Sequence, residues 1–452
     1  MAWGIGHRSS RGLLDARRGL SPRLWPHGPL GTLTDGSGGR TPELRRSARY
    51  SAAVSPAQPI RYVFVVTALA RGGTLSVMRE FWARLSKRGR IEVISHGPDS
   101  VEIGEAVTST SGRFGGPMRF PAIWIYAWRT FHAALSAARS EGRTVLLPQD
   151  SLATGAAVAV AGRLTGTPVL LMEHGSAIAV ASDYFWRERL RMPRLRDRLT
   201  KPLLRTSVWL LHRLCLRLVS HVLTAGAESE AQLQRLGVDP GRMTRYHFPV
   251  DLERYRPADE GRRAEARAAL GLEAAELVLA SVSRLTPEKG VDLVIAALAT
   301  VPAGERPLLV VGGAGPQRAA LEAEAVRAEV QARFVGELSP DQVAELLAAA
   351  DLFVYAGRQG ANTPYAVLEA MASGVAVVAT TEPAVHGEML ADGRGIAVPP
   401  DDPTSMADAI RRLAGSSELR AKAGRNARAY IERWHAPEVL DRELEAVIGR
   451  FS

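Results

Sequence analysis

Two cations lie close together in a short segment between an apolar run and a helical pattern. Arg284 and Lys289 lie in "SRLTPEKG", after the apolar run "LVLASV" and before the helical pattern "VDLVIAALA". Arginine binds phosphate through a bidentate fork and lysine through a point charge, and the start of the following helix would add its positive end. The segment predicts a diphosphate site, with two solvated charges as the alternative.

A glycine-rich turn follows the next apolar run, in "VVGGAGPQRAALEAEA" (310–325). It is not a dinucleotide fingerprint, because the third glycine counted from Gly313 would fall at Arg318. A tight turn feeding a helix could still bring backbone N–H groups near an anion. A purely structural turn between strand and helix is the alternative.

A carboxylate stands among apolar residues in "GANTPYAVLEAMASG" (360–374). Pro364 suits the first turn of a helix, which places Glu369 about a turn and a half into it. A carboxylate there could accept two hydroxyl hydrogen bonds, as a ribose diol would offer. The alternative is a capping or surface acid, which is common near the start of a helix.

Length and charge set the broad class. The chain has 452 residues, too many for one ordinary core, so two domains are expected. Its net charge of +10 is uneven: residues 1–58 carry +6 and residues 181–220 carry +7, which leaves −3 for the rest. This distribution argues against a uniformly basic nucleic-acid binder.

Residues 1–58 mix Gly, Pro, Ser and Arg without a period, so we expect a disordered basic tail. A transit peptide or a mis-assigned start are alternatives, while the long apolar stretch of a secretory signal is missing. The single cysteine, Cys215, permits no internal disulfide and fits a reducing compartment. No apolar run approaches the roughly 18–20 residues of a spanning helix.

The basic segment 181–220 has two interpretations. It interleaves ten cations with Phe185, Trp186, Leu204, Val208, Trp209 and Leu211. That composition is typical of an interfacial helix on anionic lipid. The alternative is an amphipathic helix packed on the amino-terminal domain with its arginines in water.

The rest of the chain alternates strand-like and helix-like segments, which predicts two doubly wound parallel sheets in tandem. Residues 98–120 form a loop, and a segment with two prolines near 250–262 marks the domain boundary. In such pairs ligands bind in the cleft at the carboxyl ends of the strands. The expected strands are 61–67, 91–95, 144–148, 168–172, 221–224, 277–282, 307–311, 333–335, 352–355, 376–379 and 395–398.

From about residue 60 onward the chain resembles the retaining glycosyltransferases of the GT-B fold, family 4 (glycosyl transferases group 1) in particular. The order and spacing of six motifs together carry this resemblance. They are "RGGTLSVMREFWARLSKRG", "LMEHGS", "HVLTAGAESEAQLQRLGVDPGRMTRYHFPVDLERYRP", "SRLTPEKGVDLVIAAL", "TPYAVLEAMASGVAVVAT" and "VHGEMLADGRGIAVPPDD".

The resemblance implies two Rossmann-like domains facing across a cleft. Residues 59–255 would bind the acceptor and residues 262–430 the nucleoside-diphosphate sugar, with a helix in 431–452 crossing back to the amino-terminal domain. Arg284 and Lys289 match the pair that neutralises the diphosphate, whose charge grows as the sugar–phosphate bond breaks.

The same comparison assigns the remaining site residues. His174 would contact a hydroxyl of the transferred sugar, which completes a catalytic set with Arg284 and Lys289. Glu369 would hold the ribose hydroxyls. The other donor-binding residues that the resemblance implies are Gly72, Gly73, Gly313, Asn362 and Thr363.

One departure concerns the E-x7-E motif. The family's first Glu, which usually contacts the donor sugar, is Ala361 in this chain. Either the sugar is bound differently, or Arg358, Gln359 or Asn362 takes over, or activity is lost. The linker also departs from the family, because "HFPVD" (247–251) keeps only Val250 and Asp251 of the usual pattern.

We therefore expect a cytoplasmic, metal-independent hexosyltransferase that needs no cofactor. It would move a sugar to a glycan or lipid-linked acceptor with retention of configuration, with possible contact to anionic membrane through 181–220 and no nucleic-acid partner. The rival from another class is a catalytically weak GT-B homologue that binds nucleotide or acts as a scaffold. A nucleotide-sugar epimerase of similar fold is a second rival.

Overall fold

The computed structural model describes residues 59–66, 73–95, 120–174, 199–273, 276–358, 364–382 and 385–451. The tail predicted at 1–58 and nearly all of the loop predicted at 98–120 lie outside these ranges.

The amino-terminal half is built on parallel strands. Their order is β2-β1-β3 in one sheet and β4-β5-β6 in another. A single bridge between Leu146 and Val169 joins β3 to the segment that enters β4. The strands are β1 (Ile60–Val66), β2 (Gly89–Ser95), β3 (Thr144–Pro148), β4 (Leu170–Glu173), β5 (His221–Thr224) and β6 (Met243–Arg245).

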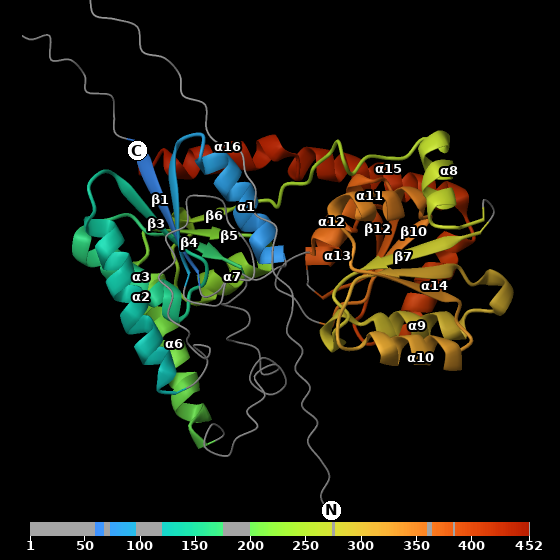
Figure 1. Ribbon diagram of the computed structural model, residues 1–452, viewed down its shortest axis with the longest axis horizontal. Coiled ribbons are helices and arrows are strands. Elements are labelled where there is room, and N and C mark those ends of the chain that lie inside the picture. Colours follow the sequence, from blue (N-terminus) through green and yellow to red (C-terminus); the bar gives the residue numbers. More distant parts are fainter. Residues whose placement is uncertain are drawn as a thin grey trace, which may run out of the picture. The chain divides into compact units, whose positions relative to one another are not determined.

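Helices cover this half on both sides (Figure 1). On one side α2, α3 and α6 pack together over a core that includes Val63, Leu146 and Leu204. The helices are α1 (Gly73–Leu85), α2 (Ala122–Arg139), α3 (Ala153–Thr165), α6 (Lys201–Leu218) and α7 (Ala227–Arg235), with the 3-10 turn η2 (Pro240–Arg242).

The carboxyl-terminal half contains one parallel sheet of six strands in the order β12-β11-β10-β7-β8-β9. Counted from β7, this is the doubly wound order in which the chain reverses direction between the first and fourth strands. The switch point therefore lies between β7 and β10. The strands are β7 (Val278–Val282), β8 (Leu308–Gly312), β9 (Ala332–Gly336), β10 (Leu352–Tyr355), β11 (Ala376–Thr380) and β12 (Gly395–Val398).

Two helix layers enclose this sheet, with α9, α10 and α14 on one face and α11, α12 and α15 on the other (Figure 1). The remaining helices are α8 (Glu260–Ala269), α13 (Val385–Met389) and α16 (Pro437–Ile448). The layers comprise α9 (Val291–Thr300), α10 (Arg318–Arg327), α11 (Pro340–Ala349), α12 (Tyr365–Ala372), α14 (Pro403–Ala414) and α15 (Ser417–Trp434), and the 3-10 turns are η3 (Pro287–Lys289) and η4 (Ala303–Glu305).

The last helix, α16, pairs with the amino-terminal half. Asp441 forms an ion pair with Arg84 on α1 at 2.9 Å. The Glu443 carboxylate lies 2.6 Å from Nδ1 of His247. Between these two acids, α16 presents a stripe of buried apolar residues that includes Leu440 and Leu444. The residue limits assigned to the domains remain a prediction.

The sequence prediction of two doubly wound parallel sheets is confirmed, and each expected strand is present within one or two residues of its limits. Two local predictions were wrong. The three-residue strand β6 was missed, because a strand this short has no period. The aperiodic segment 250–262 also ends in a helix, since Asp259 caps the start of α8 by accepting from the Arg262 N–H at 2.8 Å.

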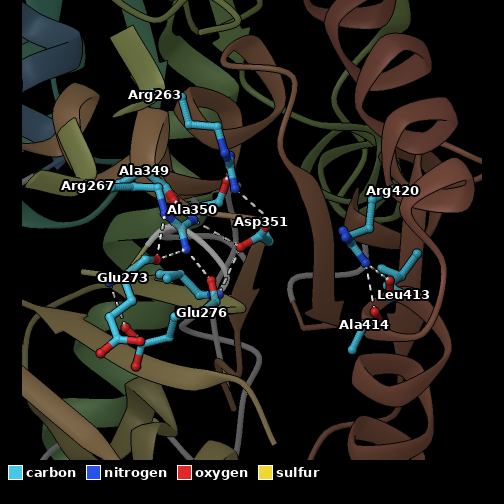
Figure 2. A network of polar contacts seen from close by, with 11 residues as sticks. Arg263, Arg267, Glu273, Glu276, Ala349, Ala350, Asp351, Leu413, Ala414 and Arg420 are labelled. Atoms are coloured by element: carbon cyan, nitrogen blue, oxygen red, sulfur yellow. Dashed lines mark hydrogen bonds and ion pairs between the residues drawn. The ribbon is translucent and has the colours of Figure 1, made fainter. Parts of the chain in front are cut away.

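A buried arginine anchors the switch-point strands at their amino ends (Figure 2). Arg267 on α8 is 4% exposed and donates to the carbonyl oxygens of Ala349, at 2.9 Å, and of Glu273. It also pairs with Asp351 at 3.4 Å. Asp351 in turn accepts from the Val278 N–H at 2.9 Å, so one carboxylate ties the start of β10 to the start of β7.

We expect Arg267→Met to lower the free energy of unfolding by about 3 kcal/mol, because it leaves the carbonyl groups of Ala349 and Glu273 without this donor. It also removes one of the two arginines that pair with Asp351, the other being Arg263. Arg420→Met is the matched control, since among the described residues Arg420 donates to the last carbonyls of α14, at Leu413 and Ala414, and to no other group (Figure 2). It should cost about 1 kcal/mol or less. Urea denaturation measures both, and equal losses would contradict the special role of Arg267.

Candidate functional site

The loops that follow β7 and β10 pack tightly against each other at the switch point. Gly290, which begins α9, has a φ of 68°, and a Cβ at this position would lie 1.9 Å from the Ala356 carbonyl oxygen. Only glycine fits such a position. The Arg358 N–H also donates to the Glu288 carbonyl at 3.0 Å. The two loops therefore form one unit, at the place where doubly wound sheets bind ligands.

Arg284 and Lys289 lie in the loop after β7, as the sequence indicated. Arg284 is exposed and pairs with the Glu288 carboxylate at 3.3 Å. Lys289 donates to the Tyr355 hydroxyl at 3.1 Å, and its ammonium lies 5.5 Å from the centre of that ring. Both cations share one loop next to the start of α9, whose first backbone N–H groups add positive potential.

An anion already stands beside these cations. Burial raises the pKa of Glu288, but hydrogen bonds and the charges of Arg284 and Lys289 outweigh burial and hold that pKa below its ordinary value. Glu288 is therefore ionised at neutral pH, and the loop carries one net positive charge instead of two. This carboxylate was not weighed in the sequence interpretation.

Gly313 lies so close to the loop after β7 that no side chain would fit at this position. Its φ is 139°, and a Cβ would meet the Ser283 carbonyl oxygen at 1.8 Å. Its own N–H donates to the Gly336 carbonyl at 2.6 Å. These contacts favour the structural alternative for this turn, and a direct role of Gly313 in donor binding stays a prediction.

Arg358 links three segments of this region. Its guanidinium binds Asp292 on α9 in a bidentate fashion, at 2.8 and 2.7 Å, and Asp401 at 2.5 Å. It also donates to the Pro287 carbonyl at 2.8 Å. Hydrogen bonds to Asp292 raise the pKa of Arg358. Of the three residues considered as substitutes for the missing Glu, Arg358 is therefore already committed to internal contacts.

Glu369 lies in the second turn of α12, where it is mostly buried. Burial raises its pKa to about 7, and the Tyr255 hydroxyl and the Arg254 charge offset only part of that effect. Tyr255 belongs to the segment between the two halves. The carboxyl group thus has a hydrogen-bonding neighbour within the protein, and a ribose diol would have to share or replace it.

His174 directly follows β4, and both of its ring nitrogens have protein partners. Nε2 lies 3.0 Å from the Gln149 side-chain oxygen, and Nδ1 lies 3.2 Å from the Tyr246 hydroxyl. Because the Gln149 nitrogen donates to Leu147, its oxygen must accept from Nε2–H. Burial lowers the pKa of His174 to about 4, so the ring is neutral at neutral pH.

Several predicted residues lie outside the described residues: Gly72, Asn362 and Thr363, together with Gln359 and Ala361. Gly73 is described and begins α1. The structure thus brings Arg284, Lys289 and the Gly313 turn together at the switch point. Sequence reasoning missed Tyr355 and His386. Tyr355 is the last residue of β10, and His386 lies on α13, shortly after β11 ends at Thr380. An aromatic residue at the end of a strand and a histidine soon after the next strand were the available signal.

The basic segment divides into two faces where it is described. Leu204, Val208 and Leu211 are buried against the core, as the alternative of an amphipathic helix packed on the amino-terminal domain expects. Apolar side chains nevertheless remain exposed on α6 and on α2. The two helices are joined by a hydrogen bond that the Trp124 indole on α2 donates to Ser207 on α6 at 3.0 Å. We call these exposed residues the α2–α6 surface: Trp124, Ile125, Trp128, Leu203, Trp209, Leu210 and Leu214. Phe185 and Trp186 lie outside the described residues.

Within the described ranges, no helix combines the length and the apolar character that crossing a bilayer requires.

Comparison with solved structures defines the class of fold. The chain superposes on HepE from Anabaena, solved in complex with UDP, with a TM-score of 0.69 and 16% sequence identity, over 86% of this chain and 100% of that one. The same protein in complex with UDP-glucose gives a TM-score of 0.67. The fold is therefore GT-B, with two Rossmann-like domains, as the sequence predicted.

Sequence comparison adds a family match. Residues 262–430 match the family model described as glycosyl transferases group 1. A D-inositol 3-phosphate glycosyltransferase of Saccharomonospora viridis is 32% identical over 208 residues, which cover 43% of this chain and 47% of the relative.

A second relative is 30% identical over 214 residues, which cover 45% of this chain and 55% of the relative. It is a GDP-mannose-dependent monoacylated alpha-(1-6)-phosphatidylinositol monomannoside mannosyltransferase of Corynebacterium glutamicum. The chain spans about half the length of the curated relatives it matches.

The raised pKa of Glu369 predicts a pH dependence of stability. Between pH 4.5 and pH 7 the Glu369 carboxyl group is protonated in the folded state but ionised in the unfolded state, where its pKa is the ordinary 4.5. The free energy of unfolding should therefore fall as pH rises from about 4.5 to 7. Glu369→Gln should remove that fall, by up to about 3 kcal/mol. Urea denaturation at pH 5 and pH 8 measures it, with Glu418→Gln on exposed α15 as control. If the free energy of unfolding changed equally between these two pH values in the wild type and in Glu369→Gln, the raised pKa of Glu369 would be contradicted.

Proposed function

We propose that this chain is a glycosyltransferase that moves a hexose from a nucleoside-diphosphate sugar to a glycan or lipid-linked acceptor, with retention of configuration and without a metal ion. The observation that carries the proposal is the loop 283–290 at the switch point of the six-stranded sheet. It joins two cations to the start of α9, in a domain that matches glycosyl transferases group 1. That combination suits a diphosphate.

The reaction depends on stabilising the leaving diphosphate more than on a nucleophile supplied by the protein. The bond between the sugar C1 and the phosphate oxygen breaks, the acceptor oxygen bonds to C1 on the same face, and the acceptor proton passes to the departing phosphate. Negative charge grows on the diphosphate as the first bond breaks. Arg284 and Lys289 would stabilise that charge in the transition state, and therefore contribute to kcat as well as to binding.

Neutral His174 would serve as a hydrogen-bonding group and not as a cation. Its ring is fixed with the proton on Nε2 by Gln149 and Tyr246. A sugar hydroxyl could bind it by replacing one of those partners. The names of the two curated relatives support both a soluble inositol phosphate and a lipid-linked mannoside as acceptor classes.

The alternative is a homologue that binds nucleotide without efficient transfer, and Ala361 supports it. The intact diphosphate loop argues against a scaffold that binds no nucleotide, because such a scaffold has no need of paired cations beside a helix N-terminus. Both alternatives predict nucleotide binding, so only turnover separates them. An epimerase would convert a nucleotide sugar in the absence of any acceptor.

Lys289→Ala should weaken binding of UDP, GDP or ADP, whichever stabilises the wild type, by about tenfold, because it removes a charge-assisted hydrogen bond. Transfer from the matching radiolabelled nucleotide sugar should fall further. Thermal shift and product release measure the two effects, with Lys422→Ala on exposed α15 as matched control. Binding without release or transfer of sugar from any donor would establish the alternative, and no binding of any nucleotide would refute both.

A peripheral membrane contact at the cytoplasmic face belongs to the same proposal. Helices α2 and α6 contain no Asp or Glu, while α6 carries Lys201, Arg205, Arg213 and Arg217. Arg213 stacks over the exposed Trp209 ring at 5.2 Å. Exposed aromatic and aliphatic groups set among cations fit an anionic lipid surface, which would bring the enzyme to lipid-linked acceptors.

The triple variant Trp128→Ser, Trp209→Ser and Leu210→Ser should bind vesicles of phosphatidylcholine and phosphatidylglycerol at least about tenfold more weakly, because it removes the inserting side chains. Flotation at low and high salt measures binding. The matched control replaces Val326 and Leu419, which are 78% and 39% exposed on the other domain, by Ser. The proposal is wrong if the wild type does not float with anionic vesicles at low salt.

A further inference from the structure

One buried imidazole beside the diphosphate loop lacks a partner on one of its nitrogens. His386 on α13 is fully buried, and its Nδ1 lies 2.8 Å from the Thr380 carbonyl oxygen. Because a carbonyl oxygen can only accept, Nδ1 must carry the proton and donate it. Nε2 is then an unprotonated acceptor, and it is buried without a hydrogen-bond partner in the described chain.

A buried acceptor without a donor is costly and rare in folded proteins, so it needs an explanation. Protonation does not provide one here. Burial lowers the pKa of His386 to about 4, and the nearby Lys289 charge adds to that effect, while the Thr380 carbonyl opposes it. At neutral pH the ring therefore keeps a free lone pair on Nε2.

The position of the ring connects it with the proposed donor site. The His386 ring meets the Tyr355 ring edge to face, with 5.6 Å between their centres. Lys289 lies 5.5 Å from the centre of the same Tyr355 ring and donates to its hydroxyl. Tyr355 thus contacts both the imidazole and the ammonium that we propose to bind the diphosphate.

The chemistry of the missing partner narrows its identity. Nε2 needs a donor, and the diphosphate of a nucleotide offers acceptors only. Next to the diphosphate, a nucleoside-diphosphate sugar carries hydroxyl groups on its sugar. We propose that His386 Nε2 accepts a hydrogen bond from a hydroxyl of the donor sugar. This inference rests on the proposed function, and it supplies an acceptor in a chain where Ala361 has no carboxylate.

The hydroxyl reaches Nε2 only when a covering side chain shifts, since the atom is shielded from solvent. The effect of His386 should therefore concern the sugar and not the nucleotide. The hydrogen bond from Nδ1 to the Thr380 carbonyl and the contact with Tyr355 fix the orientation of the His386 ring.

Two variants separate the two nitrogens. His386→Asn can keep a donor to Thr380 and loses the distant acceptor, whereas His386→Gln places an amide oxygen near the position of Nε2. The probes are the nucleoside diphosphate that binds the wild type, chosen from UDP, GDP and ADP, and its conjugate with glucose or mannose. Calorimetry gives the ratio of the two affinities for each protein.

We expect His386→Asn to weaken binding of the nucleotide sugar by about three- to tenfold, the effect of one hydrogen bond. Its affinity for the nucleoside diphosphate should stay within about twofold of the wild type, and His386→Gln should recover part of the loss. Lys289→Ala serves as the reference, because it should weaken both ligands.

The ratio within one protein guards against misfolding, since a damaged variant loses both ligands together. An unchanged ratio in His386→Asn, or an equal loss of both ligands in both His386 variants, would overturn the role of His386 while the proposed function stands. Failure of the wild type to bind any of the three nucleotides would overturn the proposed function, and the inference with it.

Discussion

The adjacency of β7 and β10 is the constraint on which the carboxyl-terminal domain depends. About seventy residues separate these strands along the chain, yet they pair in parallel at Leu279 with Leu352 and Ala280 with Phe353. Asp351 fastens them at their amino ends, and the contact of Gly290 with Ala356 closes them at their carboxyl ends. The loops that leave this pair run in opposite directions, which creates the space where a ligand can meet two helices.

Charge at this edge is balanced before any ligand arrives. Arg358 pairs with both Asp292 and Asp401, and Glu288 pairs with Arg284 and precedes Lys289 in the chain, so three cations stand against three carboxylates. Ion pairs that are exposed contribute little stability on their own, but here they connect loops that share no backbone ladder. The arrangement holds the loop after β7 in one conformation, so that less entropy is lost when an anion binds.

Sequence patterns predicted the architecture well because buried parallel strands are continuous apolar runs. "RYVFVV" and "AVVA" could hardly form anything else once glycine turns and helical periods separated them. The cation pair at 284 and 289 was equally visible, since both residue types and their place after a strand have a chemical meaning. Glu288 was not, because an acid between two cations looks like an ordinary surface charge.

Other parts of the site depended on contacts that no local pattern records. The buried faces of Leu204, Val208 and Leu211 follow from the position of α6 on α3, which the composition of 181–220 did not reveal. The raised pKa of Glu369 comes from its burial in the folded domain, and the Tyr255 hydroxyl that partly offsets it lies more than a hundred residues earlier in the chain. His386 and Tyr355 come into contact only in the folded chain, where β10 and β11 pair side by side.

The hydrogen bond from Tyr246 to His174 has a mechanical consequence. Tyr246 directly follows β6 and leads into the segment 247–259 that connects the two halves of the chain. The orientation of the imidazole is therefore set partly by where that connection begins. If the path of the connection changed so that the phenol withdrew, Nδ1 would lose its donor and, of the described partners, only Gln149 would hold the ring, so the connection and the imidazole are mechanically coupled.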